Sequence, residues 1–358
     1  MKAAVCYEYP KFVIEEVDID PPEKDGVKVR VAAAAICHSD LHQVRGEHGG
    51  ELPAIGGHEV AGIIEEVGED VTSVKPGDHV VASSQTSGCG RCINCTLGLH
   101  HMCTNRRFVK NRHHNKKGQS IGAMGGRVAG FAEYTTLAET QVVKIPDEMP
   151  LDRASLLACG VITGFGAVVN RAQVKPHSSV VVVGCGGVGL NAIQGAVFCG
   201  GHPVIAVDVL DNKLEAARVF GATHTVNSAK VEDPIKAVQE LTSGRGADYV
   251  ILTAAGGGTE LNRQSFLMSG PRGMMVMVGM TGGELGINRM HFGAERMLTS
   301  STMGSIGLGI FIPRLVSLYQ AGRLKLDELI TGRISLEQIN EGMDALERGE
   351  ALRTIIMF

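Results

Sequence analysis

The sequence contains no tryptophan, and aromatic residues make up only 4% of its 358 positions. A surface that binds nucleic acid by stacking bases on aromatic side chains is therefore not expected. The formal net charge is −4, so the chain also lacks the positive excess that nucleic-acid and membrane binders use. No stretch approaches the roughly 20 apolar residues that cross a bilayer, and the first residues lack the apolar core of a signal peptide. We expect a cytoplasmic protein with neither nucleic acid nor membrane as a partner.

The composition is that of a folded globular protein, with 44% hydrophobic and 20% charged residues. The length suits two domains of ordinary size. Glycine occurs 47 times, which favours tight turns and close approaches between helices and strands.

The pattern of elements changes along the chain. The first 150 residues predict short strands, for example at 27–33 and 59–67, and a Pro76-Gly77-Asp78 turn precedes a strand from His79. From about residue 180, strands (180–183, 204–207, 249–252 and 274–278) alternate with helices, one of them at 211–220 with Asp211 as its cap. Two helices follow residue 302, the second capped by Ser335, and a last strand covers 351–357. The alternation predicts an α/β fold with a doubly wound parallel sheet.

A glycine-rich turn follows the strand at 180–183 and precedes a helix expected at 190–198. Its members are Gly184, Gly186, Gly187, Val188 and Gly189. Such a turn brings backbone N–H groups to a pyrophosphate at the start of a helix. Asp208 ends the next strand, where an acid accepts a hydrogen bond from the adenosine ribose, which favours NAD over NADP. The alternative is that these glycines only pack the helix against the sheet.

Four of the nine cysteines, Cys89, Cys92, Cys95 and Cys103, are close together in the sequence. Four thiolates without an open position are typical of a structural zinc site. An iron–sulfur cluster is the alternative, but Thr104 stands where ferredoxins carry a proline, and no second run supplies more ligands. Solvated free thiols are a further alternative. We expect Cys6, Cys185 and Cys199 to be reduced and packed.

The remaining soft metal ligands are too far apart in the sequence for their spacing to show that they converge. Several motifs together nevertheless resemble, in order and over nearly the whole chain, the zinc-dependent medium-chain alcohol dehydrogenase family (MDR superfamily). They are Cys37-His-Ser-Asp, Gly57-His58-Glu59, the Pro76-Gly77-Asp78-His79-Val80 turn, the four-cysteine cluster, Cys159-Gly-Val-Ile-Thr163-Gly, the glycine turn and Arg353-Thr-Ile-Ile.

The resemblance implies a discontinuous, β-rich, GroES-like catalytic domain at residues 1–160 and 303–358, and a Rossmann NAD-binding domain at 161–302. It implies reversible oxidation of an alcohol to an aldehyde or ketone by hydride transfer to nicotinamide C4. It further implies a homodimer or homotetramer, with residues 298–310 as the candidate contact.

The resemblance also implies roles for single residues. Cys37, His58 and Cys159 would hold a catalytic zinc with an open fourth position, which makes two zinc ions per chain. Around it, Ser39 would bind the substrate oxygen, His42 would end a proton relay, Asp40 would orient His58, and Glu59 would border the metal. A surface histidine is the alternative for His42. Contacts to NAD are expected from the glycine turn with Asp208 and from His38, Thr163, Lys213, Val278 and Arg353.

The substrate is less well defined. His48 and Gln85 are expected near the substrate pocket. A basic run carries no acid: Arg106, Arg107, Lys110, Arg112, His113, His114, Lys116 and Lys117. It is either a solvated loop or an attractor for an anionic substrate such as a carboxylate, a phosphate or a coenzyme A ester.

Three other functions stay open at this point. The first is a polyol dehydrogenase, against which Cys159 argues because polyol enzymes tend to carry a glutamate there. The second is a dehydrogenase for a glutathione-linked alcohol. The third is a non-catalytic, cofactor-binding structural module.

Overall fold

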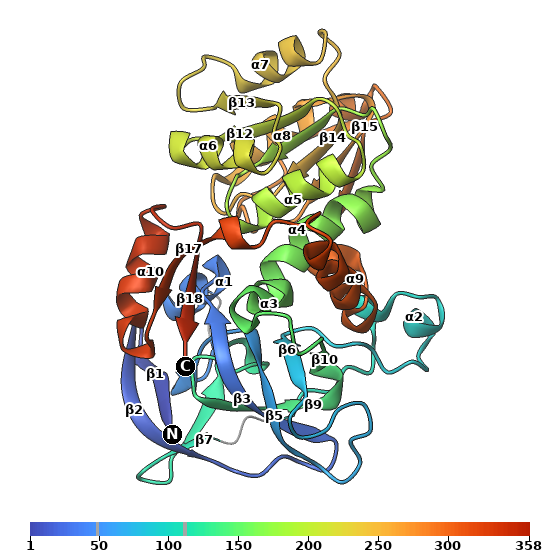
Figure 1. Ribbon diagram of the computed structural model, residues 1–358. Helices are drawn as coiled ribbons and strands as arrows, with labels where there is room; N and C mark the ends of the chain where they lie inside the picture. Colours follow the sequence, from blue (N-terminus) through green and yellow to red (C-terminus); the bar gives the residue numbers. More distant parts are fainter. Residues whose placement is uncertain (48–49, 110–112) are drawn as a thin grey trace. The chain divides into compact units, whose positions relative to one another are not determined.

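The structure is a computed structural model that describes residues 1–47, 50–109 and 113–358. The chain forms two compact units (Figure 1). The first unit contains Met1–Cys159 and Gly307–Phe358, and the second contains Gly160–Ile306.

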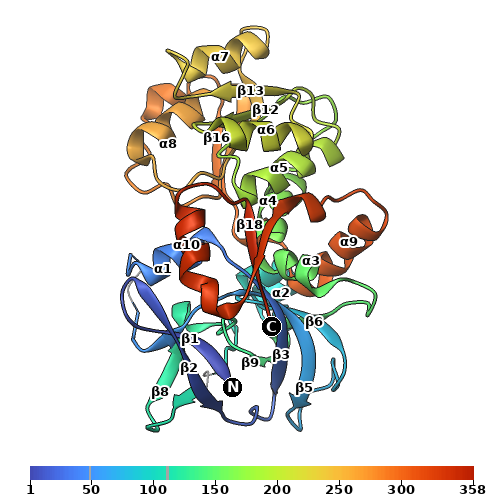
Figure 2. The same cartoon turned by 60° about the vertical axis from the view of Figure 1, so that its left-hand side comes forward.

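The first unit is built mainly from strands. A closed barrel contains β1 (Lys2–Glu8), β2 (Lys11–Ile19), β7 (His113–Asn115), β8 (Ser120–Ala123) and β4 (Ala54–Ile55). A second sheet has the order β10 (Val142–Lys144), β6 (His79–Ser83), β5 (Glu59–Val67), β3 (Gly26–Ala35), β18 (Arg353–Met357) and β17 (Ile330–Ile334), and β9 (Tyr134–Ala138) also pairs with β3. The last strand of the chain therefore lies beside one of the first, as Figure 2 shows.

Buried and more exposed side chains alternate along part of β3, and this pattern suits a strand at the centre of the sheet. Val27, Val29 and Val31 are buried, and the small alanines that follow allow neighbouring strands to pack closely. The helices of this unit are α1 (His38–Val44), α2 (Ile93–Thr96), α3 (Leu151–Leu156), α9 (Leu308–Gln320) and α10 (Ile339–Glu347). The predicted cap at Ser335 is confirmed, because its N–H donates to Gln338 Oε1 over 3.1 Å. It caps a 3₁₀ turn, Leu336–Gln338, and α10 begins one residue later.

The second unit is the predicted doubly wound parallel sheet. Its strands follow the order β13 (His224–Asn227), β12 (Val204–Asp208), β11 (Val180–Val183), β14 (Ala247–Leu252), β15 (Ser269–Met277) and β16 (Met297–Ser300). Connecting helices are α4 (Ile162–Gly166), α5 (Gly187–Phe198), α6 (Asp211–Val219), α7 (Pro234–Leu241) and α8 (Gly258–Leu267). Strand order reverses at β11, so the turn after β11 lies at the point where such sheets bind ligands.

Some predicted boundaries were wrong. Helix α5 begins at Gly187, inside the glycine turn, because glycines 187 and 189 already adopt helical backbone. Asp211 is the first residue of α6 and not its cap, which is Leu210. The sequence did not predict a long helical run: Leu151–Ala172 has 22 residues and is long and apolar enough to cross a membrane by length and composition. Its apolar window is, however, 78% buried inside the protein, as in the core helix of a globular fold.

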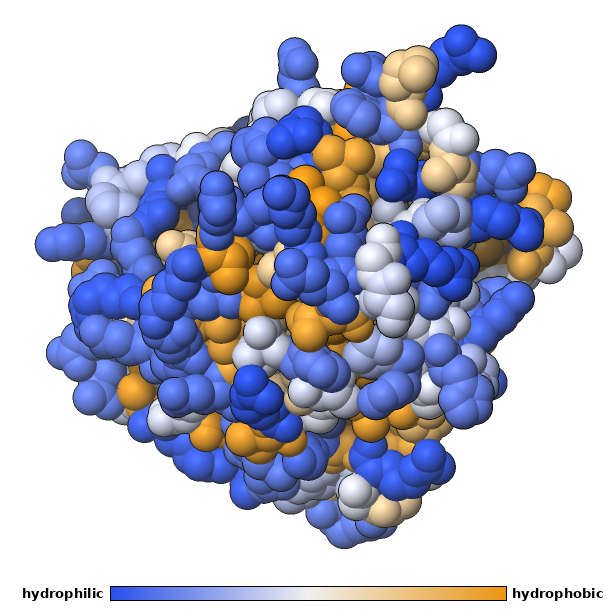
Figure 3. All heavy atoms as spheres, turned by 90° about the horizontal axis from the view of Figure 1, so that it is seen from above, coloured by the Kyte–Doolittle hydropathy of each residue, from blue (hydrophilic) through white to orange (hydrophobic). Residues whose placement is uncertain are grey.

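The surface of the molecule seen from above in Figure 3 is largely hydrophilic, with separate apolar patches between charged and polar side chains. Apolar side chains exposed in the second unit include Val197, Val209 and Met290. Single exposed apolar residues of this kind are ordinary on globular proteins.

Two candidate metal centres and a coenzyme loop

The four predicted cysteines form one cluster around α2. The sulfur atoms of Cys89, Cys92, Cys95 and Cys103 all lie within 4.8 Å of one another. Backbone groups stabilise them: the N–H of Cys92 donates to Cys89 Sγ, and the N–H of Cys89 donates to Cys103 Sγ, each over 3.4 Å. Backbone hydrogen bonds from Cys95 and Thr104 lower the pKa of Cys92 to about 5. This set of thiolates fits a closed, tetrahedral zinc site.

Strand register explains why a second set of ligands converges. Ala35 on β3 lies opposite Glu59 on β5, and Glu59 lies opposite Ser83 on β6. Cys37 follows the end of β3 and His58 precedes β5, so both lie at one edge of the sheet (Figure 1).

A hydrogen bond brings the third ligand to the same edge. Ser83 Oγ donates to the carbonyl of Ala158 over 2.6 Å, which holds the helical turn that carries Cys159. Ligand atoms of Cys37, His58, Glu59 and Cys159 all lie within 4.8 Å of one another.

A buried carboxylate organises this second cluster. Asp40 is fully buried, its Oδ1 lies 2.9 Å from His58 Nδ1, and its Oδ2 accepts the N–H of Cys37 over 2.9 Å. Burial opposes a charged imidazole, but the charge of Asp40 outweighs it and raises the pKa of His58 to about 10. Because Asp40 accepts the hydrogen bond from Nδ1–H of His58, Nε2 is left for a metal. Hydrogen bonds with Cys159 and His58 hold the pKa of the buried Cys37 thiol well below its usual range. Two sulfurs and one imidazole nitrogen are donors that zinc prefers.

Glu59 makes a contact that the sequence did not predict. Its carboxylate pairs with the guanidinium of Arg353 at the start of β18, and both side chains are buried. Arg353, which is expected to contact NAD, therefore also neutralises the acid beside the metal ligands.

The glycine turn has the geometry of a phosphate-binding loop. Gly184 has φ +90°, and a Cβ there would lie 2.6 Å from the backbone of Ala254, while a Cβ on Gly189 would lie 1.8 Å from Gly184 O. A Cβ on Gly186 would meet nothing within 4 Å, so this glycine faces open space that a ligand can fill. Residues 184–189 therefore fit a dinucleotide at the N-terminus of α5.

Asp208 at the end of β12 also holds the turn. Its Oδ2 accepts the N–H of Cys185 over 2.7 Å, and its Oδ1 accepts the N–H of Leu210 over 3.0 Å. The ammonium of Lys213 is buried close enough for the two charges to interact, and burial lowers its pKa. The thiols of Cys6 and Cys185 are buried as predicted, whereas Cys199 is half-buried.

The structure places the other predicted residues as follows. Ser39 Oγ lies 3.9 Å from Cys37 Sγ, beside the second cluster. His42 is half-buried on α1 and its Nδ1 contacts the carboxylate of Glu47, while His38 is exposed. In the second unit, Thr163 Oγ1 donates to Met303 Sδ over 3.7 Å, and the N–H of Val278 donates to Leu252 O over 2.9 Å.

The two predicted pocket residues have different outcomes. His48 lies outside the described residues. Gln85 is 1% exposed and its amide is used within the protein: Nε2 donates to the carbonyl of His101, and Oε1 accepts from Arg106 Nη1, each over 3.2 Å. Gln85 is therefore a fixed structural element rather than a free polar lining.

The basic run is less available than its composition suggested. Arg107 pairs with Glu23 at 3.0 Å and with Asp25 at 2.9 Å, and Lys116 pairs with Asp18 at 2.8 Å. His114 lies 3.2 Å from Asp20, and His113 is buried, while Lys110 and Arg112 lie outside the described residues. Acids at 18–25, remote in sequence, therefore neutralise much of the run. The exposed side chains of Arg107 and Lys116 fit the first alternative, a solvated loop.

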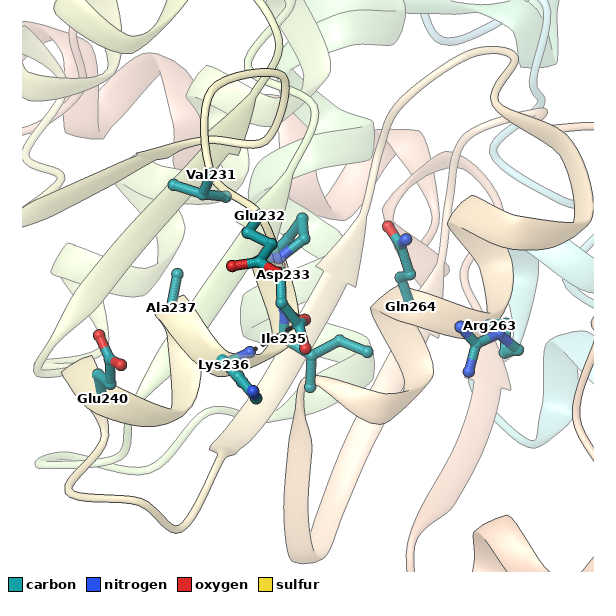
Figure 4. Close-up of a pocket in the computed structure, with 10 residues that line it drawn as sticks. Val231, Glu232, Asp233, Ile235, Lys236, Ala237, Glu240, Arg263 and Gln264 are labelled. Atoms are coloured by element: carbon teal, nitrogen blue, oxygen red, sulfur yellow. Dashed lines mark hydrogen bonds between the residues drawn. The ribbon is translucent and has the colours of Figure 1, made fainter.

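A hollow of about 540 Å³ between α7 and α8 contains none of the predicted residues (Figure 4). Glu232, Asp233 and Glu240 line it together with Lys236 and Arg263, so its charges are mixed. Asp233 is already used, because it accepts the N–H groups of Ile235 and Lys236 as the cap of α7.

Comparisons with known proteins agree with this geometry. Residues 23–147 match the family model of the alcohol dehydrogenase GroES-like domain, and residues 187–316 match that of the zinc-binding dehydrogenase. The NDMA-dependent alcohol dehydrogenase of Amycolatopsis methanolica is 38% identical over 99% of this chain and 98% of its own length.

Solved structures are similar over the whole chain. An alcohol dehydrogenase zinc-binding domain protein from Burkholderia ambifaria has a TM-score of 0.91 and 32% identity, and the match covers 100% of this chain and 98% of the other. The benzyl alcohol dehydrogenase of Acinetobacter calcoaceticus has a TM-score of 0.89 and 32% identity, with 100% and 99% coverage.

Proposed function

Because this chain belongs to the zinc-dependent medium-chain alcohol dehydrogenase family, we propose that Cys37, His58 and Cys159 hold its catalytic zinc. The chain is an NAD-linked zinc alcohol dehydrogenase whose substrates are small alcohols and aldehydes. The observation that carries the proposal is that two thiolates and an imidazole meet in one place, with the imidazole oriented by a buried carboxylate.

When bound, zinc would supply Lewis-acid chemistry at the substrate oxygen, and NAD would serve as the hydride acceptor. The protein residues hold these groups and move the proton. Asp40 keeps His58 in the tautomer that leaves Nε2 for the metal. Ser39, next to the cluster, would hydrogen bond to the substrate oxygen, accept its proton and pass its own hydroxyl proton on, and His42 would accept the proton at the end of this relay and release it to solvent. Glu59, held by Arg353, borders the metal.

We propose that the first unit is the catalytic domain and the second the NAD-binding domain. Both cysteine clusters lie in the first unit, and the glycine turn with Asp208 lies in the second. Contacts to NAD are proposed for that turn and for His38, Thr163, Lys213, Val278 and Arg353.

We also propose that the protein is a cytoplasmic homodimer or homotetramer. Strand β16 ends the parallel sheet, and Met297 and Ser300 on it are exposed, which leaves an edge that can pair with a second copy. Light scattering after gel filtration measures the assembly, and replacing Thr299 by proline should shift it towards the monomer.

The catalytic site is tested by zinc analysis combined with kinetics. We expect the native enzyme to hold two zinc ions per chain, and Cys37→Ser or Cys159→Ser to hold one. Their kcat/KM should fall by about 10³-fold or more, since a zinc ion supplies several kcal/mol of transition-state stabilisation. Cys199→Ser, a half-buried thiol in the other unit, is the matched control. Full turnover in both ligand variants would overturn the assignment.

The assay should cover primary, secondary, aromatic and acidic alcohols with NAD. Each should also be measured with NDMA present, because the Amycolatopsis methanolica relative is named as dependent on it. Turnover of polyols or of glutathione-linked alcohols only would favour one of the alternative dehydrogenase functions.

A further inference from the structure

A tight turn at the end of α1 brings Glu47 back to His42. Gly46 follows the helix with φ +73°, in the left-handed region that glycine adopts most readily, and a Cβ there would lie 2.8 Å from the ring of Tyr9. The N–H of Glu47 then donates to the carbonyl of His42 over 3.1 Å. The backbone therefore fixes the place of Glu47 relative to the histidine.

The carboxylate of Glu47 selects one protonation form of the His42 ring. Its Oε2 lies 2.5 Å from His42 Nδ1. An ionised carboxylate only accepts hydrogen bonds, so Nδ1 carries the proton, and in the neutral ring Nε2 is then the basic nitrogen. Nε2 is buried, whereas 43% of the Glu47 side chain is exposed. The ring therefore presents its basic nitrogen to the protein and its N–H to the carboxylate at the surface.

The order of residues along α1 connects this pair to the second cluster. His42 follows Ser39 by three positions, so the two side chains are neighbours on one face of the helix. Ser39 Oγ lies 3.9 Å from Cys37 Sγ. Ser39, His42 and Glu47 thus follow one another from the second cluster to the exposed carboxylate.

Other charged groups around the pair belong to α1 and to α10, which packs against it. Arg45 lies 3.7 Å from Glu47 and also pairs with Glu347 on α10. On α1 itself, His38 is exposed and Asp40 is held by His58. Glu347 is therefore an acid of the same group of charges that can be removed while the contact between Glu47 and His42 stays in place.

We propose that Glu47 is a positioning residue of the proton relay, whose carboxylate holds His42 in the Nδ1–H form and stabilises the positive ring that forms when Nε2 accepts the proton. The inference rests on the proposed function, because it adds a residue to the relay of the same site. In this step an N–H bond forms at Nε2 and an O–H bond of the relay breaks, no electron is transferred, and the proton later leaves to water. The aspartate of a Ser-His-Asp triad acts on its histidine in the same way.

The test follows NADH formation in a single turnover of an alcohol with NAD, so that slow product release does not hide the proton step. It is run in dilute and in concentrated HEPES, a tertiary amine that is a poor zinc ligand. In dilute buffer the rate of Glu47→Gln should fall about 5- to 20-fold, with KM values within about twofold of native, because only proton transfer is impaired. Concentrated buffer should restore most of the rate, since an external base then accepts the proton. Glu47→Asp, which keeps the carboxylate, should lose less.

Glu347→Gln is the matched control, and its rate should equal that of the native enzyme in both buffers. A native rate in Glu47→Gln, an equal loss in Glu347→Gln, or a loss that concentrated buffer does not relieve would overturn the inference.

The proposed function can fail separately, and nitrogen NMR of the histidine rings then decides the role of Glu47. If no alcohol is oxidised, the ring signals of His42 are assigned in labelled protein by their absence from His42→Gln. A neutral ring protonated at Nδ1 in the native protein and in Glu347→Gln, but shifted towards the Nε2–H form in Glu47→Gln, supports the positioning role. A native ring protonated at Nε2, or no change in Glu47→Gln, overturns it.

Discussion

The two cysteine-containing clusters of the first unit are assembled in opposite ways. All ligands of the four-cysteine cluster come from one short loop, and backbone N–H groups of that loop stabilise its thiolates. The second cluster takes its ligands from the ends of two strands and from a helical turn far away in the sequence. Side chains stabilise it, chiefly Asp40. The difference teaches that a closed site can organise a loop by itself, whereas an open, reactive site depends on the fold around it.

The largest expected effect is a difference in folding between variants of the two clusters. Cys103→Ser should strongly reduce the yield of folded protein, because structural zinc contributes about 10–16 kcal/mol in small zinc domains, as much as the whole stability of a typical protein. Cys159→Ser should remain folded, since strand pairing builds its surroundings. Circular dichroism, the midpoint of thermal unfolding and zinc content measure the difference. Equal stability of the two variants would contradict the distinction.

A second prediction concerns His113, a buried histidine whose pKa shifts in the opposite direction to that of His58. His58 has Asp40 beside it, whereas burial lowers the pKa of His113 to about 4, and its Nε2–H donates only to the carbonyl of Tyr134 over 3.1 Å. The unfolded chain takes up a proton near pH 6.5 and the folded chain only near pH 4. The contribution of His113 to stability is therefore complete above pH 6.5 and is lost as the pH falls through this interval, by about 3 kcal/mol.

His113→Gln should make stability less dependent on pH between 6.5 and 4. The measurement is denaturant unfolding of the native protein and the variant at several pH values. His114→Gln is the control, because His114 is partly exposed and lies beside Asp20. An unchanged pH slope in His113→Gln would show that other groups cause the loss.

A third prediction concerns Asp40, the carboxylate that orients His58 in the second cluster. Asp40→Asn should keep the shape of the side chain but weaken the orientation of His58, and kcat/KM should fall about 10- to 100-fold, as for other residues that orient metal ligands. The four-cysteine site should keep its zinc. Asp70→Asn, on the surface of the same unit, should behave like the native enzyme. Loss of both zinc ions in Asp40→Asn would mean that the two sites are not independent.

The sequence predicted the local features of the molecule well and the remote contacts poorly. The four-cysteine site, the glycine turn and strands such as Val180–Val183 depend on residues that are close in the chain, so spacing and periodicity suffice. The convergence of Cys37, His58 and Cys159 depends on the register of β3, β5 and β6, which no short motif encodes. Only the resemblance to a family brought these residues together.

The sequence also failed to predict which charged side chains pair with each other. The acids at 18–25 that pair with Arg107, His114 and Lys116 lie about 90 residues earlier in the sequence. The structure therefore adds what the composition could not show: Arg107, His114 and Lys116 of the basic run each lie beside an acid. The Glu59–Arg353 pair joins the beginning and end of the chain in the same way.

The smallest expected effect concerns Ser83, whose hydroxyl links β6 to the helical turn that carries Cys159. Ser83 is fully buried on β6, and its hydroxyl joins the carbonyl of Ala158 to the N–H of Gln85. Ser83→Ala leaves these two groups unpaired, which costs about 1–3 kcal/mol, and it frees the turn that carries Cys159. Since the assembled site depends on this link, kcat/KM should fall about 3- to 10-fold, with little change at the four-cysteine site. Ser84→Ala, the adjacent serine whose backbone binds Arg127, is the control. If Ser83→Ala lost stability but kept the kinetics and zinc content of the native enzyme, the hydrogen bond would support the fold alone, and strand pairing would suffice to place the third ligand.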